Sequence, residues 1–332
     1  MEPYKKRSNA GIVGIGVHIP KRKVSNKELE RYIDTSDEWI TEKTGIRSRH
    51  FTTHDKALSD IAIPAARKAL NDARVKAQDV DVVIVGAMSH DFMAGALTGN
   101  IIKKAIGAHK AYAIDLNIIC AGFIYCTEIA ASMIESGKAK TVLVINGEVF
   151  SKYPHSRVTS VIFGDGAGAV VMKEVRKDHG LLASDIGSSI DGAQNLGIFV
   201  GGSRNPFNAD TYANNEFMIT MNGREIFNFA VESFKESVET ALKKAGLKIS
   251  DVDHVFSHQA NINIIREGMR SLGLPMDKTY TTIHKYGNIG GGSIVTVLHE
   301  SRKKGILKKG DVIVNVAFGS GLAWGANVMR WA

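Results

Sequence analysis

The same order of hydrophobic and polar positions occurs twice in the chain, 172 residues apart. Ala69–Gly86 and Ala241–His258 are identical at eight of their eighteen positions, including Asp-Val-Asp at 79–81 and 251–253. In each segment the spacing of apolar residues predicts the end of an amphipathic helix, a short turn and a strand rich in β-branched residues. A shared pattern of this length predicts an internal duplication.

The segments that follow each copy also agree. Thr141–Ile145 and Asp311–Val316 are apolar runs typical of buried strands, and each is followed by a glycine-rich strand pair, Gly164–Met172 and Gly319–Met329. Both halves therefore read as helix, strand, helix, strand, helix, strand, strand. Such alternation is typical of an α/β fold with a mostly parallel sheet covered by helices. Its repetition predicts two similar halves that pack together.

We place the first half at residues 1–175 and the second at residues 180–332. The segment between them, Lys173–His179, is charged but short, and it does not have the composition of a flexible linker. Asp185–Tyr212 is rich in Gly, Ser, Asn and Asp, so we expect an elaborated surface loop there.

Composition narrows the class of protein. With 44% hydrophobic and 23% charged residues in 332, the chain is typical of soluble globular proteins and unlike disordered ones. No apolar run approaches the roughly 18 residues of a membrane-spanning helix, and the N-terminal region does not read as a signal peptide. The two cysteines, Cys120 and Cys126, form neither a disulfide framework nor a zinc motif. We therefore expect a cytoplasmic protein without a bound metal.

The charge allows two interpretations. Lys and Arg number 42 against 34 Asp and Glu, which gives a net charge of +8. Exposed lysines that maintain solubility are one explanation, and a partner carrying phosphates or carboxylates is the other. The sequence has no basic stripe with interleaved aromatic residues and no nucleic-acid-binding module. A phosphorylated small ligand or an acidic protein is therefore a better candidate than nucleic acid.

Cys120 is the first candidate catalytic residue. It follows the predicted strand Ala111–Asn117 and opens the mostly apolar predicted helix Ala121–Glu135. A thiol on the first turn of a buried helix would face unpaired N–H groups and the positive end of the helix dipole, so its pKa should be lowered, as a nucleophile requires. The alternative is a small buried hydrophobic side chain, and that is the role we assign to Cys126.

His258 and Asn288 add to this candidate site. His258 closes the predicted strand Val252–His258, and the carboxyl ends of parallel strands are where ligands bind, although a structural histidine is the alternative. Asn288 lies in a glycine-rich segment after the predicted strand Tyr280–His284. By the duplication it occupies nearly the position that Cys120 has in the first half. A cysteine, a histidine and an asparagine that converge from both halves predict a catalytic site.

Six short motifs occur around these residues, and together they identify a family. They are Thr35–Ile40 with Thr44–Arg47, Cys120–Phe123, Phe163–Gly168, His258–Asn261, Tyr286–Asn288, and Phe318–Gly321 with Trp324–Gly325. In these motifs, along nearly its whole length, the chain resembles the β-ketoacyl-acyl carrier protein synthase III enzymes. The resemblance implies the thiolase-like αβαβα five-layer fold, with two duplicated halves and mostly parallel sheets.

The resemblance also implies a decarboxylative condensation that initiates fatty acid synthesis. Cys120 would attack an acyl-CoA, and the acyl-cysteine would then react with malonyl-acyl carrier protein; both thioesters are substrates, and no cofactor is implied. His258 and Asn288 would donate hydrogen bonds to the thioester oxygen during decarboxylation. The backbone N–H groups of Cys120 and Ser320 would form the oxyanion hole, and Phe318 would screen the site from water.

Further residues correspond to substrate contacts of the family. Trp39 and Arg157 match positions that sandwich the adenine of coenzyme A. Lys43 stands where the family commonly has Arg, at a position that contacts phosphate or the carrier. Asn263 replaces a basic residue that helps to dock the acidic carrier protein. The resemblance implies a homodimer in which the partner's loop, near His90–Leu97, closes the acyl pocket.

Other departures leave the substrates open. Val158 replaces a usual Gly, Ile289–Gly292 replaces a more typical Thr-Ser-Ala-Ala, and Ala94–Thr98 lacks an expected Pro. An alternative is therefore a specialised relative that condenses or transfers an unusual acyl group in secondary metabolism or biotin-precursor synthesis. A non-catalytic scaffold would be expected to lose the nucleophile, and a papain-like hydrolase would carry a different cysteine motif.

Overall fold

The first half of the chain forms a five-stranded mixed sheet. The computed structural model describes residues 9–153 and 156–332. Across the sheet the strands are β1 (Asn9–His18), β7 (Asp165–Val175), β6 (Thr141–Val149), β4 (Val82–Gly86) and β5 (Tyr112–Leu116). Only β7 is antiparallel to its neighbours, so the other four strands run in one direction. The prediction of a mostly parallel sheet is confirmed.

The second half repeats this arrangement with one strand fewer. Its sheet has the order β11 (His254–Ser257), β12 (Val312–Gly319), β13 (Ala323–Arg330) and β8 (Gly180–Ser188). Here β13 is the reversed strand, as β7 is in the first half. The chain passes from one sheet to the other between the end of β7 and the start of β8, and β1 contacts β8.

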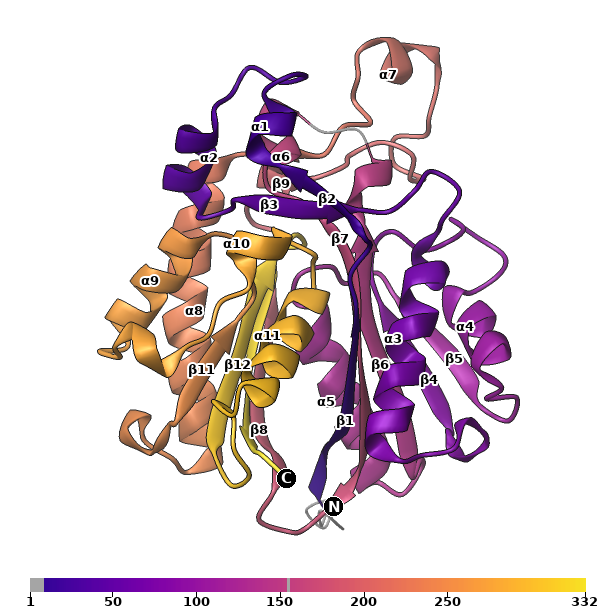
Figure 1. Ribbon diagram of the computed structural model, residues 1–332, viewed down its shortest axis with the longest axis vertical. Coiled ribbons are helices and arrows are strands. Elements are labelled where there is room, and N and C mark those ends of the chain that lie inside the picture. Colours follow the sequence, from indigo (N-terminus) through magenta and orange to yellow (C-terminus); the bar gives the residue numbers. More distant parts are fainter. Residues whose placement is uncertain (1–8, 154–155) are drawn as a thin grey trace.

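Helices form three further layers around and between the sheets (Figure 1). In the centre, α5 (Gly122–Glu135) contacts strands of both sheets and packs against α11 (Gly292–Lys303). On the outer faces lie α3 (Leu58–Ala73) and α4 (Thr98–Ile106) over the first sheet, and α8 (Gly223–Ala245) and α9 (Ile262–Ser271) over the second. This is the predicted five-layer α/β architecture. Burial of α5 explains why nearly all of its faces are apolar.

The repeated Asp-Val-Asp sequence has the same structural role in both halves. Each copy follows a 3₁₀ turn, η1 (Ala77–Asp79) or η4 (Ile249–Asp251). The second aspartate then accepts a hydrogen bond from a strand's first backbone N–H: Asp81 from Thr141 at 2.9 Å, and Asp253 from Val312 at 2.8 Å. Each carboxylate thus joins two neighbouring parallel strands of its sheet.

A cap covers the carboxyl ends of the strands. It contains the hairpin β2 (Arg22–Ser25) and β3 (Ser48–Phe51) and the helices α1 (Asn26–Leu29) and α2 (Asp37–Thr44). The buried Arg49 guanidinium donates to Asn26 Oδ1 and to the Val161 carbonyl, both at 2.7 Å. This side chain therefore ties the cap to the segment that precedes β7. The remaining short elements are η2 (Phe150–Lys152), α6 (Arg157–Ser160), η3 (Ala193–Asn195), β9 (Leu196–Gly197), α7 (Ala209–Ala213), β10 (Thr220–Met221), η5 (Met276–Lys278) and α10 (Ile283–Tyr286).

Three predicted boundaries are wrong. Tyr280–His284 is not a strand, because the Gln259 side-chain oxygen accepts the backbone N–H groups of Thr282 and Ile283, and α10 follows. The loop predicted to begin at Asp185 begins after Ser188, since β8 stays paired with β13 up to that residue. Helix α5 begins at Gly122, so Cys120 precedes the first turn.

No helix in the described ranges is long and apolar enough to cross a membrane.

Candidate active site

Cys120 lies in the connection between β5 and α5, where the two halves meet. Its side chain is buried and lines a cavity together with Ser320 and Gly321 of the second half. Gly319, the last residue of β12, packs directly against it: a Cβ at this glycine would lie 2.5 Å from Cys120 Cβ and 3.0 Å from Sγ. The absence of a side chain at residue 319 therefore makes room for the thiol.

The electrostatics of Cys120 differ from the prediction. The pKa of the thiol is raised to about 12, mainly by burial and also by the Glu148 carboxylate, whereas a hydrogen bond from the Asn288 side chain opposes the shift. The predicted lowering of this pKa is wrong because the residue precedes the helix and is enclosed, so that desolvation outweighs the helix dipole. The thiol is therefore protonated in the free protein at neutral pH.

His258 directly follows β11 and is fully enclosed. Its ring nitrogens make no hydrogen bond of normal geometry with the described residues, although the Gly290 backbone lies close enough to oppose the pKa shift in part. Burial lowers the pKa of the imidazole to about 4, so the ring is neutral and carries one N–H donor. A neutral imidazole can donate a hydrogen bond to a bound group through its one N–H.

Asn288 comes from the second half but is held by the backbone of the first. Its N–H donates to the Ile162 carbonyl at 3.0 Å, and its carbonyl accepts from Gly164 N–H at 2.9 Å. Its side-chain Oδ1 accepts from Gly290 N–H at 2.9 Å, which leaves the amide NH₂ as the donor near Cys120. The carboxamide orientation is thus fixed by the backbone.

Phe318 and Ser320 complete the enclosure. The edge of the Phe318 ring packs on the His258 imidazole, so this side of the histidine is closed to solvent. The Ser320 hydroxyl donates to the Leu196 carbonyl at 2.9 Å. The structure therefore brings Cys120, His258, Asn288, Phe318 and Ser320 into one enclosed site at the carboxyl ends of the strands, although no single sequence segment contains them.

Comparison with known proteins identifies the family to which the chain belongs. Models of the 3-oxoacyl-[acyl-carrier-protein (ACP)] synthase III family match residues 114–189 and, for its C-terminal part, 242–331. The β-ketoacyl-[acyl-carrier-protein] synthase III of Caldanaerobacter subterraneus is 41% identical over 97% of this chain and 98% of that protein. The corresponding protein of Bacillus pumilus is 42% identical over 97% of this chain and 99% of its own length. The chain belongs to the β-ketoacyl-acyl carrier protein synthase III family.

Solved structures of this family have the same fold. The 3-oxoacyl-[acyl-carrier-protein] synthase III of Aquifex aeolicus superposes with a TM-score of 0.90 at 37% identity, covering 97% of this chain and all of that one. The priming β-ketosynthase of the R1128 polyketide pathway also gives 0.90, at 29% identity over 99% of this chain and 98% of its own. The chain is thus a condensing acyltransferase with the thiolase fold.

The two residues that the resemblance assigns to coenzyme A are adjacent at the surface. The Arg157 guanidinium lies 5.6 Å from the centre of the Trp39 ring, and the Arg157 side chain also donates to the Asp34 carbonyl. Trp39 is partly exposed, and Val158 next to Arg157 is exposed too. In this structure the Arg157 guanidinium lies over the face of the Trp39 ring. A planar ring that entered between them would separate the two side chains.

Lys43 and Asn263 join α2 to the start of α9. The Lys43 ammonium pairs with Glu42 at 2.9 Å, while the Lys43 carbonyl accepts from the side chains of Asn261 at 2.9 Å and Asn263 at 3.2 Å. Asn261 also caps α9, since its side chain accepts from the Asn263 backbone N–H. Asn263 therefore has a local structural role at the position where the family uses a basic residue.

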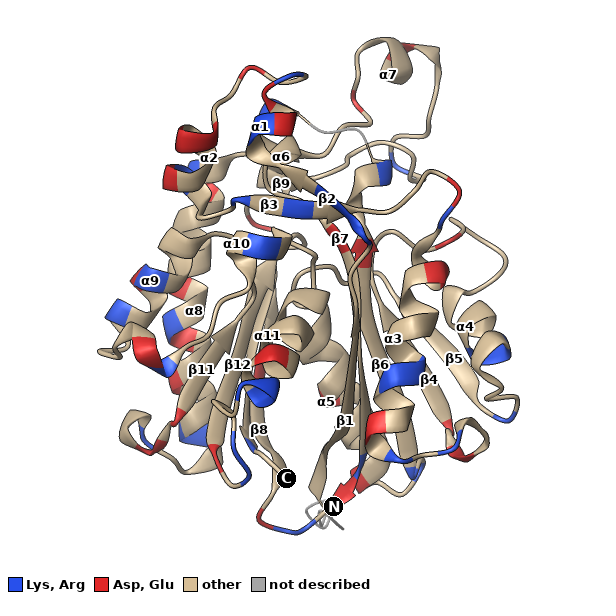
Figure 2. Cartoon of the chain, in the orientation of Figure 1, with Lys and Arg blue, Asp and Glu red and all other residues tan. Residues whose placement is uncertain are grey.

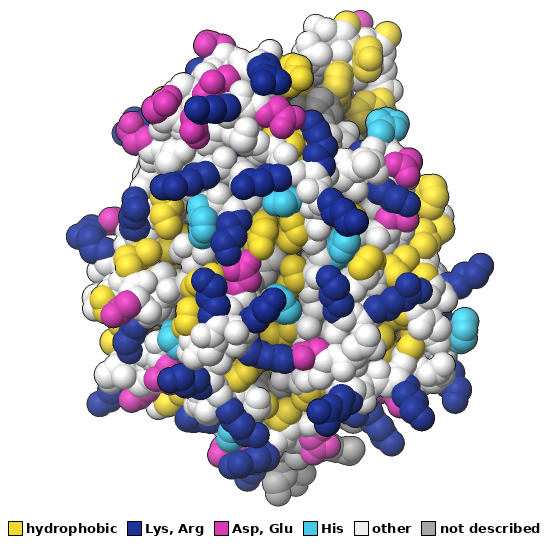
Figure 3. Space-filling model, in the orientation of Figure 1, with side chains coloured by type: hydrophobic (Ala, Val, Ile, Leu, Met, Phe, Trp, Pro, Cys, Tyr) yellow, Lys and Arg dark blue, Asp and Glu magenta, His cyan; other side chains and the backbone are white. Residues whose placement is uncertain are grey.

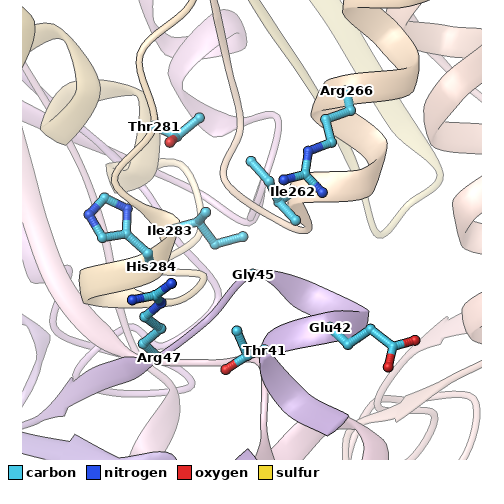
Figure 4. Close-up of a pocket in the computed structure, with 9 residues that line it drawn as sticks. All are labelled: Thr41, Glu42, Gly45, Arg47, Ile262, Arg266, Thr281, Ile283 and His284. Carbon is cyan, nitrogen blue, oxygen red and sulfur yellow. The ribbon is translucent and has the colours of Figure 1, made fainter. Parts of the chain in front are cut away.

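A second pocket beside this junction was not predicted from the sequence. It has a volume of about 560 Å³ and is shown in Figure 4; three basic side chains, Arg47, Arg266 and His284, line it. The other lining residues are Thr41, Glu42, Gly45, Ile262, Thr281 and Ile283. The pocket lies near a broad basic face: Figure 2 marks Lys and Arg positions on α9, α10, β2 and β3, and Figure 3 shows many Lys and Arg side chains across the same view. The net charge of +8 indicated an excess of basic residues, but the sequence did not show where on the surface they gather.

Among the residues that the structure describes, no group of three or more His, Cys, Asp or Glu side chains could hold a metal ion.

Proposed function

We propose that the protein condenses an acyl-CoA primer with malonyl-acyl carrier protein through an acyl group on Cys120. The observation that carries this proposal is the placement of the Asn288 carboxamide beside the buried Cys120 thiol, with Gly290 contacting both Asn288 and the neutral imidazole of His258. In the first half-reaction the Cys120 sulfur attacks the thioester carbonyl, and the bond to the coenzyme A sulfur breaks. The proton of the thiol leaves with coenzyme A as its new S–H.

The second half-reaction needs donors rather than a strong base. When malonyl thioester loses carbon dioxide, the electron pair of the broken C–C bond moves toward the thioester oxygen. A neutral His258 and the Asn288 amide can donate hydrogen bonds to that oxygen without carrying a charge of their own. The enolate carbon then attacks the acyl-cysteine, and the Cys120 sulfur departs as the new C–C bond forms. Backbone N–H groups of Cys120 and Ser320 are the proposed oxyanion hole.

The basic face supports docking of an acidic carrier protein. Asn263 adds no charge, but Arg266 lies one turn later on α9 and Arg270 one turn beyond that. Within the described residues Arg266 donates a hydrogen bond to the neutral Asn263 side chain at 3.3 Å and pairs with no carboxylate, so its charge is available to a partner. We propose that Arg266, together with Lys43, supplies the attraction that the family obtains from residue 263.

The exposed edge of the first sheet supports a homodimer. Strand β5 ends the five-stranded sheet, and a free strand edge can pair with a second copy. Large apolar side chains are exposed beside it, namely Phe92, Met93, Leu97 and Tyr112. We propose that two copies pair through β5 and that the segment around Met93 contributes to the partner's acyl site. A cytoplasmic location, which would keep Cys120 reduced, completes the proposal.

A specialised condensing enzyme remains the second candidate, because the solved priming β-ketosynthase of a polyketide pathway shares this fold over nearly the full length. The two candidates use the same chemistry and differ in the carrier. Turnover with a fatty-acid carrier protein supports the first candidate, whereas turnover only with another carrier supports the second.

The experiment that tests the shared chemistry compares the two cysteines. Intact-mass spectrometry after treatment with acyl-CoA should show one added acyl group in the wild type and in Cys126→Ala, and none in Cys120→Ala. Cys126 is a matched control because it is equally buried and its pKa is raised to the same extent. An acyl group retained in Cys120→Ala would refute the assignment of the nucleophile.

A further inference from the structure

The pocket between α2, α9 and α10 brings together three basic side chains from distant parts of the sequence. Arg47 directly precedes β3, Arg266 lies on α9 and His284 lies on α10. Figure 4 shows Arg47 and His284 on one side of the pocket and Arg266 on the other. Ile262 and Ile283 lie between them. The pocket therefore has cationic groups on two sides and an apolar surface in the middle.

These basic groups are not neutralised by acidic neighbours. Within residues 9–153 and 156–332, no carboxylate forms an ion pair with Arg47, Arg266 or His284. Glu42 is the acidic residue of the pocket wall, and its carboxylate pairs with Lys43 at 2.9 Å. In Figure 4 this carboxylate points away from the three basic side chains. Their positive charge is therefore available to a ligand.

The surroundings of His284 are positive as well. The pKa of its imidazole lies below the ordinary value, in the first place because of burial. Lys285, Arg47 and Lys304 lower this pKa further, whereas Glu300 opposes them. Glu300 is itself paired with Lys285 at 2.6 Å. An anion that entered the pocket would therefore meet a positive potential that the protein leaves unbalanced.

Fixed backbone contacts shape the pocket. Gly45 ends α2 with φ +79°, and a Cβ there would lie only 2.7 Å from Ile262 Cβ. The absence of a side chain therefore allows the end of α2 to pack on the start of α9. The Arg47 backbone N–H donates to the His284 carbonyl at 3.2 Å, which holds α10 beside the start of β3. Gly45 and Arg47 belong to the Thr44–Arg47 motif, to which the proposed condensation assigns no role.

The pocket is separate from the proposed coenzyme A contact. Thr41 lines the pocket and follows Trp39 by two positions on α2, so the two side chains point about 200° apart around the helix. Neither Trp39 nor Arg157 lines the pocket, and Cys120 lies in a different cavity. A ligand bound here would therefore contact a different face of α2 from the one proposed for coenzyme A.

The volume is larger than a single ion requires. A pocket of about 560 Å³ corresponds to about nineteen water molecules at roughly 30 Å³ each. The nine non-hydrogen atoms of pyrophosphate would fill about half of it on this scale. Arginine guanidinium groups bind phosphate oxygens through paired hydrogen bonds, and a histidine can add a further donor. The lining therefore fits phosphate groups better than a carboxylate or halide alone.

We propose that this pocket binds a small anion with two or more negative charges, carried by phosphate groups that Arg47, Arg266 and His284 contact. Binding of the anion does not depend on the proposed condensation. Its consequence does rest on the proposed carrier docking, because Arg266 belongs to both sites. A bound phosphate neutralises Arg266, so the anion competes with the acidic carrier protein and slows only the second half-reaction.

Isothermal titration calorimetry with inorganic pyrophosphate, at constant ionic strength, tests the site. We expect the affinity of the full chain to fall by about tenfold or more in Arg47→Gln and in Arg266→Gln, because each substitution removes charge-assisted hydrogen bonds. Arg270→Gln is the matched control, since Arg270 lies on the same helix but does not line the pocket. Absence of binding to the wild type, or an equal loss in all three variants, would overturn the proposal.

Two further titrations locate the bound pyrophosphate. Prior addition of coenzyme A should leave the affinity unchanged, and loss of binding would place pyrophosphate in the coenzyme A site instead. Thr281→Glu adds a carboxylate to the pocket and keeps both arginines, and we expect it to weaken binding by about tenfold or more. The melting temperature of each free variant shows whether it folds. Wild-type affinity in a folded Thr281→Glu would overturn the site.

The competition with the carrier has its own measurement. Pyrophosphate should raise KM for malonyl-acyl carrier protein in the wild type but much less in Arg47→Gln. An unchanged KM in a wild type that binds pyrophosphate would overturn the competition. Absence of acylation by every acyl-CoA would instead overturn the proposed function, and it would not alter the calorimetric result.

Discussion

The Phe318 ring meets the His258 imidazole edge to face, with ring centroids 5.9 Å apart and an interplanar angle of 73°. Both side chains are almost completely buried, at 2% and 1% exposure. The Phe318 ring thus covers one side of the His258 imidazole. In the proposed decarboxylation step this neutral ring is an N–H donor. This contact links the exclusion of water to the orientation of the donor.

Loss of either donor should separate the two half-reactions. We expect His258→Ala and Asn288→Ala to retain acylation of Cys120 but to lose decarboxylation of the malonyl thioester, each by about 10²–10³ in rate. Acylation is followed by intact mass and decarboxylation by release of labelled carbon dioxide. If either variant releases carbon dioxide at the wild-type rate, the corresponding residue does not stabilise the developing oxyanion.

Truncation of Phe318 should admit water without removing the donors. In Phe318→Ala we expect part of the enolate to be protonated before it attacks the acyl-cysteine, so that more than one carbon dioxide is released per condensation product. Phe318→Leu, which retains an apolar side chain of similar reach, is the control and should keep the ratio near that of the wild type. A ratio unchanged in Phe318→Ala would show that other residues exclude water.

The buried Glu148 should control the reactivity of Cys120 toward alkylating agents. Glu148 accepts hydrogen bonds from Met88 N–H and Ser89 N–H, both at 3.0 Å, and from the Ser89 hydroxyl, and burial raises its pKa to about 7. Its negative charge above that pH raises the pKa of the Cys120 thiol. Because removal of the charge stabilises the thiolate, Glu148→Gln should shift the pH profile of iodoacetamide alkylation at Cys120 to lower pH.

The control for this measurement is alkylation of Cys120 in Asp165→Asn. Asp165 raises the pKa of Glu148 but is not among the groups that shift the thiol, so its loss should move the profile much less. Identical profiles in the wild type and in Glu148→Gln would show that burial alone sets the thiol pKa.

Carrier docking should depend on Arg266. We expect Arg266→Glu to raise KM for malonyl-acyl carrier protein, and Asn263→Arg to lower it, because an acidic partner is attracted by surface charge. Both effects should shrink with added salt, since the Debye length is about 8 Å at physiological ionic strength. Acylation by acyl-CoA should be unaffected in either variant.

Steady-state kinetics at two salt concentrations measure these differences. Lys309→Glu is the charge-matched control for Arg266→Glu, because Lys309 precedes β12, at the opposite end of the sheet from His258. An equal change of KM in Arg266→Glu and Lys309→Glu would mean that net charge, rather than a docking site on α9, sets the affinity.

The proposed pairing of two copies through the edge of β5 should weaken when one outward-facing backbone N–H is removed. Tyr112 N–H and Leu116 C=O face β4, so by alternation the N–H of Ala113 faces the open edge. Ala113→Pro removes that donor without removing a hydrogen bond within the sheet. We expect sedimentation velocity to show a dimer for the wild type and dissociation at higher concentrations for this variant, with a similar melting temperature. A wild type that is monomeric and fully active would contradict the dimer.

The duplication was predictable from the sequence because it depends on short-range patterns that occur in both halves. Asp81 and Asp253 join equivalent strand pairs, and a side chain with such a fixed local role leaves a repeated motif. The strand at Tyr280–His284 was wrongly predicted because the side chain of Gln259, outside that segment, takes the backbone donors that a strand would have used. No pattern within residues 280–284 contains that information.

That Asn288 would lie near Cys120 was predictable from the duplication, but the electrostatics of the thiol were not. Position before a helix suggested a thiol with a lowered pKa at Cys120, whereas enclosure by residues such as Gly319 makes desolvation the larger effect. Likewise, the substitution at Asn263 suggested lost charge, and only the packing of α2 against α9 shows that Arg266 lies at the same junction. Burial and proximity between distant segments decide both cases.

The backbone bridge between Phe163 and Asn288 makes the candidate site dependent on both halves of the chain. The backbone of Asn288 is held by hydrogen bonds to Ile162 and Gly164, which belong to the other half of the duplication. A chain with only one half folded would still have its cysteine, or its histidine and asparagine, but would lack the backbone bridge that holds Asn288 beside the first half. Formation of the proposed decarboxylation site therefore requires both halves of the duplication to be folded against each other.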